Sequence, residues 1–178
     1  MPNTQELLTR YAHYHRDRRN ITTHLIGVPM IVLAVGVLLA RARFELVGFP
    51  LSAAWLAWAA STAWYLSRGQ GLVEWMVSGA VGALVGLAHP LADGSTAHWL
   101  GWGVGLFSLG WVIQFVGHYF EGRKPAFVDD LVGLLVGPLF VVAELLFALG
   151  LCLTLRHDIE AEAGPTRSGP APSAAKAS

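Results

Sequence analysis

Long apolar stretches separated by short polar ones run through most of this sequence. Four apolar windows follow one another at about 23–40, 46–66, 73–92 and 97–117. Each approaches the roughly 20 residues that a helix needs to cross the hydrocarbon core of a bilayer. Between Leu46 and Phe120, charged residues are confined to Arg68, Glu74 and Asp93. The pattern predicts an all-α, polytopic helical membrane protein with about four spans.

The segment before the first window has a different pattern. From Thr4 to about Arg16, apolar residues such as Leu7, Leu8 and Tyr11 recur at intervals of three and four. This spacing predicts an amphipathic helix that lies at the membrane interface. The polar, arginine-containing start lacks the layout of a cleaved signal peptide, so we expect it to be retained.

A last apolar run extends from Leu131 to Leu155 and contains Pro138 and Glu144. As a straight helix it would be about 37 Å long at 1.5 Å per residue, enough to carry the chain across the membrane. Proline interrupts helices, and an ionisable residue at membrane depth usually faces protein or water. We therefore expect a broken or re-entrant segment, with a break near Gly137 and Pro138 and with Glu144 turned toward protein.

The composition changes again after about Ile159, where Ala, Gly, Pro and Ser dominate. Such a segment buries too little apolar surface to offset the entropy that it would lose on ordering. The sequence thus predicts a single helical membrane domain over 1–160 and a disordered tail over 161–178.

Composition and charge support a membrane protein and exclude other classes. Hydrophobic residues make up 54% of the chain and charged residues 13%, outside the usual range of soluble domains. A net charge of zero gives no electrostatic basis for binding nucleic acid. A single cysteine, Cys152, excludes an intrachain disulfide framework and a cysteine metal cluster.

The distribution of basic residues favours an even number of crossings. With an even number, all lysines and arginines except Arg41 and Arg43 share the side of the two termini. The positive-inside rule then places both termini in the cytoplasm. The membrane would be a bacterial inner membrane or the endoplasmic reticulum, depending on the source, and the oligomeric state is left open.

Four histidines stand at the ends of the apolar segments, on one side of the membrane in the even topology: His15, His24, His118 and His157. Imidazole is the commonest metal ligand near neutral pH, and a histidine-rich site suits iron, zinc, copper or nickel. Gln114 and Glu121 lie four and three residues from His118, so one helix face can carry them as partners that orient its imidazole. The sequence therefore predicts a candidate metal site on the cytoplasmic side.

Arg123 and Lys124 border the same region. Arginine suits paired hydrogen bonds to a carboxylate, so these residues are candidates for binding an amphiphilic acid. The alternative is that the pair serves only to orient the protein in the membrane.

Several blocks of the sequence resemble the small membrane proteins typified by the 2-hydroxy fatty acid dioxygenase of the yeast endoplasmic reticulum. The longest block is Gly110-Trp111-x-x-Gln114-Phe115-Val116-Gly117-His118, which runs into Phe120-Glu121-Gly122-Arg123-Lys124-Pro125-Ala126. The others are Tyr14-His15, Asn20, His24, Val28-Pro29, Asp130-Leu131, Glu144 and His157-Asp158. The resemblance covers about 10–40 and 107–160, and the stretch between them agrees only in being apolar.

This resemblance implies an iron(II)-dependent dioxygenase that uses molecular oxygen to remove one carbon from a 2-hydroxy fatty acid by α-oxidation, giving the shorter acid and carbon dioxide. The implied cofactor is Fe(2+), with the four histidines at 15, 24, 118 and 157 as its ligands. Asn20, Glu144 and Asp158 match the family blocks and are expected beside these ligands. The fatty chain would lie among the apolar helices, next to membrane lipid.

Two alternatives from other classes stay open on the sequence alone. One is a non-catalytic membrane scaffold with structural histidines, and the other is a haem electron carrier with two axial histidines. No glycine-rich phosphate-binding motif is visible, so the sequence gives no reason to expect a nucleotide cofactor.

Overall fold

The computed structural model describes residues 1–46, 48–69, 71–123 and 132–169. Its elements, in chain order, are α1 (Thr4–Ala12), α2 (Arg18–Ala40), β1 (Arg43–Leu46), β2 (Phe49–Ser52), α3 (Ala53–Leu66), α4 (Leu72–Ala92), α5 (Thr96–Glu121), α6 (Gly133–Ala148) and α7 (Leu153–Ala163). Within these ranges the only sheet is the small antiparallel hairpin of β1 and β2.

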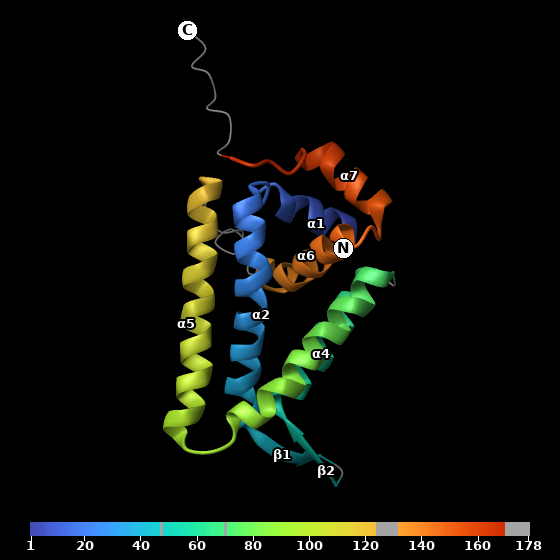
Figure 1. Cartoon of the computed structure of the whole chain (residues 1–178). Coiled ribbons are helices and arrows are strands. Elements are labelled where there is room, and N and C mark those ends of the chain that lie inside the picture. The colour runs from blue at the N-terminus through green and yellow to red at the C-terminus, as the bar shows by residue number, and fades with distance from the viewer. Residues whose placement is uncertain (47, 70, 124–131, 170–178) are drawn as a thin grey trace.

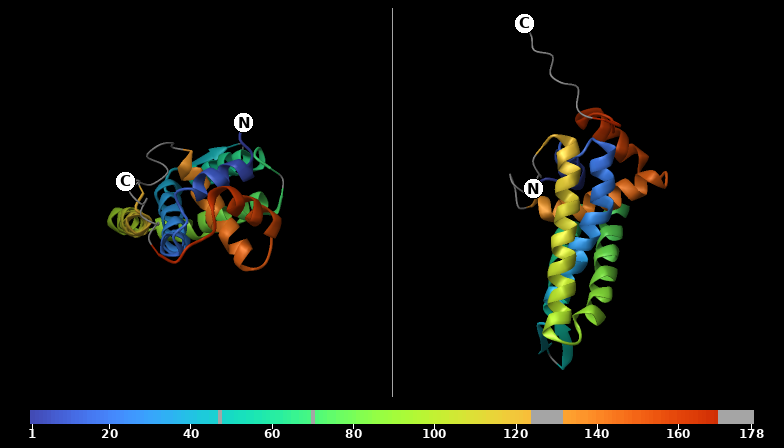
Figure 2. Two further views of the ribbon diagram at one scale, coloured as in Figure 1. Left: turned by 90° about the horizontal axis from the view of Figure 1, so that it is seen from above. Right: turned by 60° about the vertical axis from the view of Figure 1, so that its left-hand side comes forward.

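The long helices form an elongated bundle (Figures 1 and 2). α2 and α5 run antiparallel and side by side, and α4 crosses beside α2. At one end lie α1, α7, the start of α2 and the end of α5; we call this the α1 end. The hairpin and the turn between α4 and α5 form the opposite, hairpin end.

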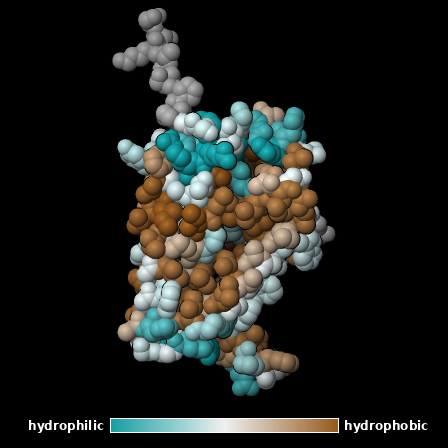
Figure 3. Space-filling view, in the orientation of Figure 1, coloured by the Kyte–Doolittle hydropathy of each residue, from teal (hydrophilic) through white to brown (hydrophobic). Residues whose placement is uncertain are grey.

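Three of the described helices, α2, α4 and α5, are long and apolar enough to cross a membrane. The bent pair of α6 and α7 would make a fourth if it counted as one span. On the face that Figure 3 shows, a belt of hydrophobic residues crosses the bundle between hydrophilic residues at its two ends. This distribution matches the apolar core and polar faces of a bilayer. The prediction of a polytopic helical membrane protein is confirmed.

The second apolar window does not form one spanning helix. Its first residues belong to the hairpin, in which Arg43 pairs with Ser52. α3 then has 14 residues, about 21 Å at 1.5 Å per residue, against a hydrocarbon core of about 30 Å. Gly48 takes a positive φ of 78° at the hairpin turn, and Pro50 lacks a backbone N–H, so neither favours a helix. The prediction of a helix over 46–66 is therefore wrong for residues 46 and 48–52.

The last apolar run is broken, as predicted, but at a different place. α6 continues through Gly137 and Pro138, because one missing N–H in its second turn removes a single hydrogen bond. α6 and α7 meet at 115° across a short break, where Gly150 and Cys152 have positive φ angles of 77° and 53°. A right-handed helix cannot continue through such residues. The expected break near Gly137 and Pro138 is wrong, and the chain returns to the α1 end (Figure 1).

The amphipathic helix predicted from Thr4 to about Arg16 is confirmed as α1, which ends earlier, at Ala12. Asn3 caps it by accepting a hydrogen bond from the backbone N–H of Glu6 at 2.9 Å. Its apolar face is buried in the same cluster as residues of α6. The side chain of Thr4 donates to the buried carboxylate of Glu74 in α4. These contacts fix α1 across the end of the bundle.

The end of the chain also contributes to this region. The predicted tail began at 161, whereas α7 extends to Ala163. Arg167 exchanges backbone hydrogen bonds with Arg16 and Arg18. Residues 170–178 lie outside the described residues.

Glycine allows α2 and α5 to approach closely where they cross. A Cβ on Gly27 would lie 3.0 Å from the carbonyl oxygen of Gly110. A Cβ on Gly110 would lie 3.1 Å from the carbonyl oxygen of Gly27 and 2.7 Å from Cγ1 of Ile31. The two backbones thus touch, as is common where small residues line membrane helix pairs.

We expect Gly110→Ala to destabilise the protein by about 1–3 kcal/mol, because the new methyl group meets backbone that cannot yield. Gly105→Ala on the same helix is the matched control, since nothing lies within 4 Å of a Cβ at that position. Alanine's higher helix propensity should leave the control as stable as the parent protein or slightly more stable. Thermal unfolding in detergent measures both, and equal midpoints would contradict the prediction.

Candidate metal centre

Three histidines from distant parts of the chain meet inside the α1 end. His15 lies between α1 and α2, His24 in the second turn of α2 and His118 in the last turn of α5. All three are buried, and one ring nitrogen of each lies within 4.8 Å of those of the other two. The ring centroids are 4.3, 4.9 and 5.1 Å apart. The structure therefore brings together three of the four predicted histidines.

Backbone carbonyls fix the protonation of two of these rings. Nδ1 of His15 lies 2.7 Å from the carbonyl oxygen of Tyr11, and Nδ1 of His24 lies 2.9 Å from that of Asn20. Because a carbonyl only accepts, each Nδ1 must carry the hydrogen, and Nε2 of a neutral ring then carries a lone pair. The two Nε2 atoms lie 3.0 Å apart. Lone pairs at this distance repel each other unless a proton or a metal cation lies between them.

A metal cation accounts for this geometry better than a proton. Burial lowers the pKa of His15 well below its ordinary value, and the neighbouring His24 lowers it further, so the ring is neutral at pH 7. Nδ1 of His118 is also buried and has no hydrogen-bond partner in the described part of the chain. Nitrogens bound at about 2.1 Å to one ion lie roughly 3 Å apart, which matches the observed pair.

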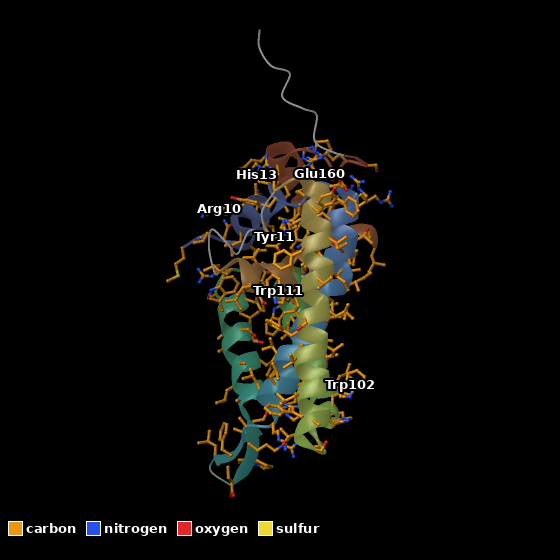
Figure 4. All side chains as sticks on the ribbon, turned by 90° about the vertical axis from the view of Figure 1, so that its left-hand side faces the viewer. Arg10, Tyr11, His13, Trp102, Trp111 and Glu160 are labelled. Carbon is orange, nitrogen blue, oxygen red and sulfur yellow. The ribbon has the colours of Figure 1, made fainter. Side chains whose placement is uncertain are left out.

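Aromatic side chains pack around the cluster. The ring of Tyr11 stacks on His15 with a centroid distance of 4.0 Å and an interplanar angle of 3°. Phe140 of α6 lies 5.4 Å from the same imidazole. In Figure 4, Tyr11 lies nearer the middle of the bundle than Arg10 on the preceding position. This packing fixes the ring of His15 and keeps bulk water away from it.

The carboxylate of Glu121 holds the chain that follows His15. Its Oε2 accepts hydrogen bonds from the backbone N–H groups of Arg16 and Asp17, at 3.0 and 2.8 Å, and from Nδ2 of Asn20 at 3.1 Å. The last residue of α5 is thereby tied to the start of α2. Helical spacing had suggested that Glu121 orients its neighbour on α5, but these hydrogen bonds support His15 instead.

A cavity of about 60 Å³ opens beside His24 and His118. Gln114, one turn deeper along α5, lines it, and its Oε1 is buried without a hydrogen-bond partner among the described residues. Further from the α1 end the wall becomes apolar. The apolar lining consists of Val28, Ile31, Val32, Trp111, Leu134 and Pro138. The cavity is thus polar next to the histidines and apolar deeper in the bundle.

His157 and Asp158 do not join the cluster. The side chain of His157 is 85% exposed and lies 3.9 Å from Asp158. Leu155 and Ile159, four residues apart, pack against the hydrophobic core, so His157 falls on the opposite face of α7. A ring in this position does not share an ion with three buried ones.

Arg123 lies outside the cavity. It donates to the carbonyl oxygen of His13 at 2.9 Å and is exposed. With Arg10 and Arg68 it lines an outer groove of about 840 Å³, which shares Tyr11 with the inner cavity. Lys124, the other predicted substrate-binding residue, lies outside the described residues.

Sequence reasoning missed the role of Arg16. Its guanidinium is buried, donates to the carbonyl oxygen of His15 at 2.9 Å and lies 3.7 Å from Glu144. Burial lowers the pKa of Arg16, and the carboxylate of Glu144 opposes that decrease. Glu144 thus faces protein, as expected. Nothing in the sequence distinguishes Arg16 from the exposed Arg18 nearby. The packing role of Tyr11, by contrast, could have been predicted from its place on the apolar face of α1.

Fold and site together define a helical membrane protein with a buried three-histidine cluster at one end of its bundle. The chain matches the Mpo1-like family, described as 2-hydroxy-palmitic acid dioxygenase Mpo1-like, over residues 1–149. It is 34% identical over 157 residues to the 2-hydroxy-palmitic acid dioxygenase MPO1 of Saccharomyces cerevisiae, which covers 84% of this chain and 86% of that protein. No solved structure matches the chain. The chain therefore belongs to the Mpo1-like family, and the resemblance seen in the sequence is confirmed.

Burial of His15 should make the stability of the metal-free protein depend on pH. The unfolded chain binds a proton at this residue near pH 6.5, whereas the folded chain binds it only at lower pH. The free energy of unfolding is therefore highest above pH 6.5 and should fall by up to about 1.4 kcal/mol per pH unit below it. Thermal unfolding with a chelator, between about pH 7.5 and about pH 5.5, measures the decrease. His15→Gln should lose less stability over this pH range than the parent protein. An identical loss would show that His15 is not the source of the pH dependence.

Proposed function

We propose that this protein is an iron(II)-dependent dioxygenase that performs α-oxidation of 2-hydroxy fatty acids. The observation that carries the proposal is the pair of Nε2 atoms of His15 and His24, held 3.0 Å apart by backbone carbonyls that fix both tautomers. Membership in the Mpo1-like family, whose yeast member is a 2-hydroxy-palmitic acid dioxygenase, supports the reaction class.

The residues present fit a bound Fe(2+) ion. His15, His24 and His118 would hold it, and imidazole is a common ligand of iron. Bound there, iron supplies the chemistry that activates molecular oxygen toward the substrate. Three neutral protein ligands would leave the charge of the ion free to attract a carboxylate.

The chain's own residues position the substrate. The unpaired Oε1 of Gln114 can accept a hydrogen bond from the 2-hydroxyl group. Val28, Ile31 and Trp111 line the deeper, apolar part of the cavity and would contact the first carbons of the chain. The buried position of the cluster keeps bulk water from the reacting carbons.

The reaction balances without an external reductant. A 2-hydroxy acid and one molecule of oxygen give the acid one carbon shorter, carbon dioxide and water. The bond between C1 and C2 breaks, C2 becomes the new carboxyl carbon, and C1 leaves as carbon dioxide. The electrons lost by these two carbons reduce the oxygen, which agrees with the absence of a nucleotide-binding motif in the sequence.

The place of the site suits an amphiphilic substrate. The cluster lies at the α1 end, where hydrophilic residues border the apolar belt (Figure 3). We assign to Arg123, in the outer groove with Arg10 and Arg68, the attraction of the substrate carboxylate from the interface. The positive-inside rule favours the cytoplasmic side for this end and for both termini.

The two alternatives account for less of the geometry. Ring centroids only 4.3–5.1 Å apart leave no space for a macrocycle between any two of the histidines. A purely structural role for these histidines leaves the facing lone pairs of His15 and His24 unexplained. The three-histidine metal site answers both points.

Metal content and turnover together test the proposal. Purified protein loaded with iron(II) should convert 2-hydroxypalmitic acid to the acid one carbon shorter, only with oxygen present, and should show no haem Soret band. His15→Gln, His24→Gln and His118→Gln should each lose iron and at least about 100-fold of the turnover. His157→Gln and, at the hairpin end, His98→Gln should keep both.

A Soret band in the purified protein would support a haem carrier instead. Full iron content and turnover in any of the three cluster variants would remove that histidine from the ligand set. Stoichiometric iron without oxygen-dependent conversion would leave a metal site but overturn the reaction.

Gln114→Leu tests the positioning of the substrate. The change removes the hydrogen-bond acceptor at similar size, so the apparent KM for the 2-hydroxy acid should rise roughly fivefold to tenfold. Iron content should not change, because Gln114 is not one of the three ligands. Loss of iron, or an unchanged KM, would contradict a direct contact with substrate.

A further inference from the structure

The segment after α7 crosses the start of α2 directly beside the metal centre. We call residues 164–167 the C-terminal strap. The backbone N–H of Arg167 donates to the carbonyl oxygen of Arg16 at 2.8 Å, and the N–H of Arg18 donates to the carbonyl oxygen of Arg167 at 2.9 Å. These bonds form a parallel bridge between Asp17 and Arg167. The strap therefore binds the chain immediately after His15.

A second pair of contacts anchors both ends of the strap. The buried guanidinium of Arg16 donates to the carbonyl oxygen of Gly164 at 3.1 Å. The guanidinium of Arg167 donates to Oε1 of Glu121 at 2.5 Å. Ile159 is buried in the core and fixes the direction in which α7 delivers the strap. The strap thus has a defined position on the protein.

The ion pair between Arg167 and Glu121 explains how the C-terminal strap affects the histidine cluster. The side chain of Glu121 is 1% exposed, and burying a carboxylate is costly unless its charge is compensated. Its other partners are the neutral backbone N–H groups of Arg16 and Asp17 and the amide of Asn20. Arg167 supplies the positive charge in direct contact with it. The same carboxylate accepts the hydrogen bonds that hold the chain after His15.

We infer that Arg167 is a positioning residue of the metal centre: through Glu121 it fixes the segment that presents Nε2 of His15. This inference rests on the proposed function for the identity of the ion. Metal–ligand distances tolerate only about 0.2 Å of deviation, so loosening this segment weakens metal binding. The strap lies beyond residues 1–149, which match the family, and so adds a support that the family match does not include.

Substitutions at Arg167 test the inference in the full-length protein. Arg167→Gln removes the charge, and Arg167→Lys keeps it but offers no planar fork of donors. Arg156→Gln is the matched control, because Arg156 pairs with Glu160 on an exposed face of α7. Two quantities are measured on metal-free protein: the Kd for cobalt(II), from its absorption bands, and the rate of hydrogen exchange at the amides of Arg16 and Asp17.

We expect Arg167→Gln to raise the Kd for cobalt(II) at least about 10-fold and to speed exchange at both amides. Arg167→Lys should lie between this variant and the parent protein, and Arg156→Gln should match the parent. Unchanged Kd and unchanged exchange in Arg167→Gln would overturn the inference. If that variant does not fold, parent-like values in Arg167→Lys would overturn it and intermediate values would support it.

The two hypotheses fail in different ways. A parent protein that binds no cobalt(II) and no iron contradicts the proposed function. Hydrogen exchange then still decides the role of the strap: faster exchange in Arg167→Gln than in Arg156→Gln supports it, and equal exchange overturns it.

Discussion

The carbonyl oxygens of Tyr11 and Asn20 impose the constraint on which the rest of the site depends. Each accepts from Nδ1 of a histidine four residues further along the chain. Tyr11 stands near the end of α1, and its carbonyl oxygen also accepts from the backbone N–H of Tyr14 at 3.1 Å, so His15 uses the second lone pair. Two such hydrogen bonds are enough to turn both Nε2 atoms toward one point. Everything else around the cluster keeps these rings in place or supplies the third nitrogen.

Charged side chains support the histidine cluster. Glu121 and Asp17 are buried beside His15 and face several arginines. The guanidinium of Asp17's neighbour Arg19 lowers the pKa of Asp17, so this carboxyl stays ionised. Concentrating charge at one end of the bundle is compatible with a membrane, because that end lies beyond the apolar belt (Figure 3). A site at this position can be polar without placing unpaired charge in hydrocarbon.

The sequence predicted the helical membrane fold and three members of the cluster because both depend on strong local signals. Apolar windows indicate spans, and histidines at their ends meet when the helices are antiparallel. His157 also stands at the end of an apolar segment, and the chain does return to the α1 end. Its orientation depends on the phase of α7 about Leu155 and Ile159, which only the packing of that helix decides. End position was predictable, whereas side-chain direction was not.

Other features of the structure depend on contacts that the local sequence does not reveal. Pro138 was expected to break its helix, but the break lies at Gly150 and Cys152, where the backbone adopts left-handed angles that Cys152 does not signal. Glu121 has the right spacing to serve His118, yet its hydrogen bonds go to a segment more than 100 residues earlier in the chain. Arg167 lies in a stretch whose composition predicts disorder. Partners so distant in sequence leave no trace in helical periodicity.

The size of the cavity constrains what a hydroxy fatty acid would experience here. The volume of about 60 Å³ is well below the roughly 300–1,000 Å³ of pockets that enclose a whole drug-sized ligand. It accommodates the carboxylate and hydroxyl end of such a substrate but not a long alkyl chain. Most of the chain would therefore extend past Ile31 and Trp111 toward the outer surface of α2 and α5, where exposed apolar side chains meet lipid. Under the proposed function, the cavity would hold the head of the acid and the bilayer would solvate the rest of its chain.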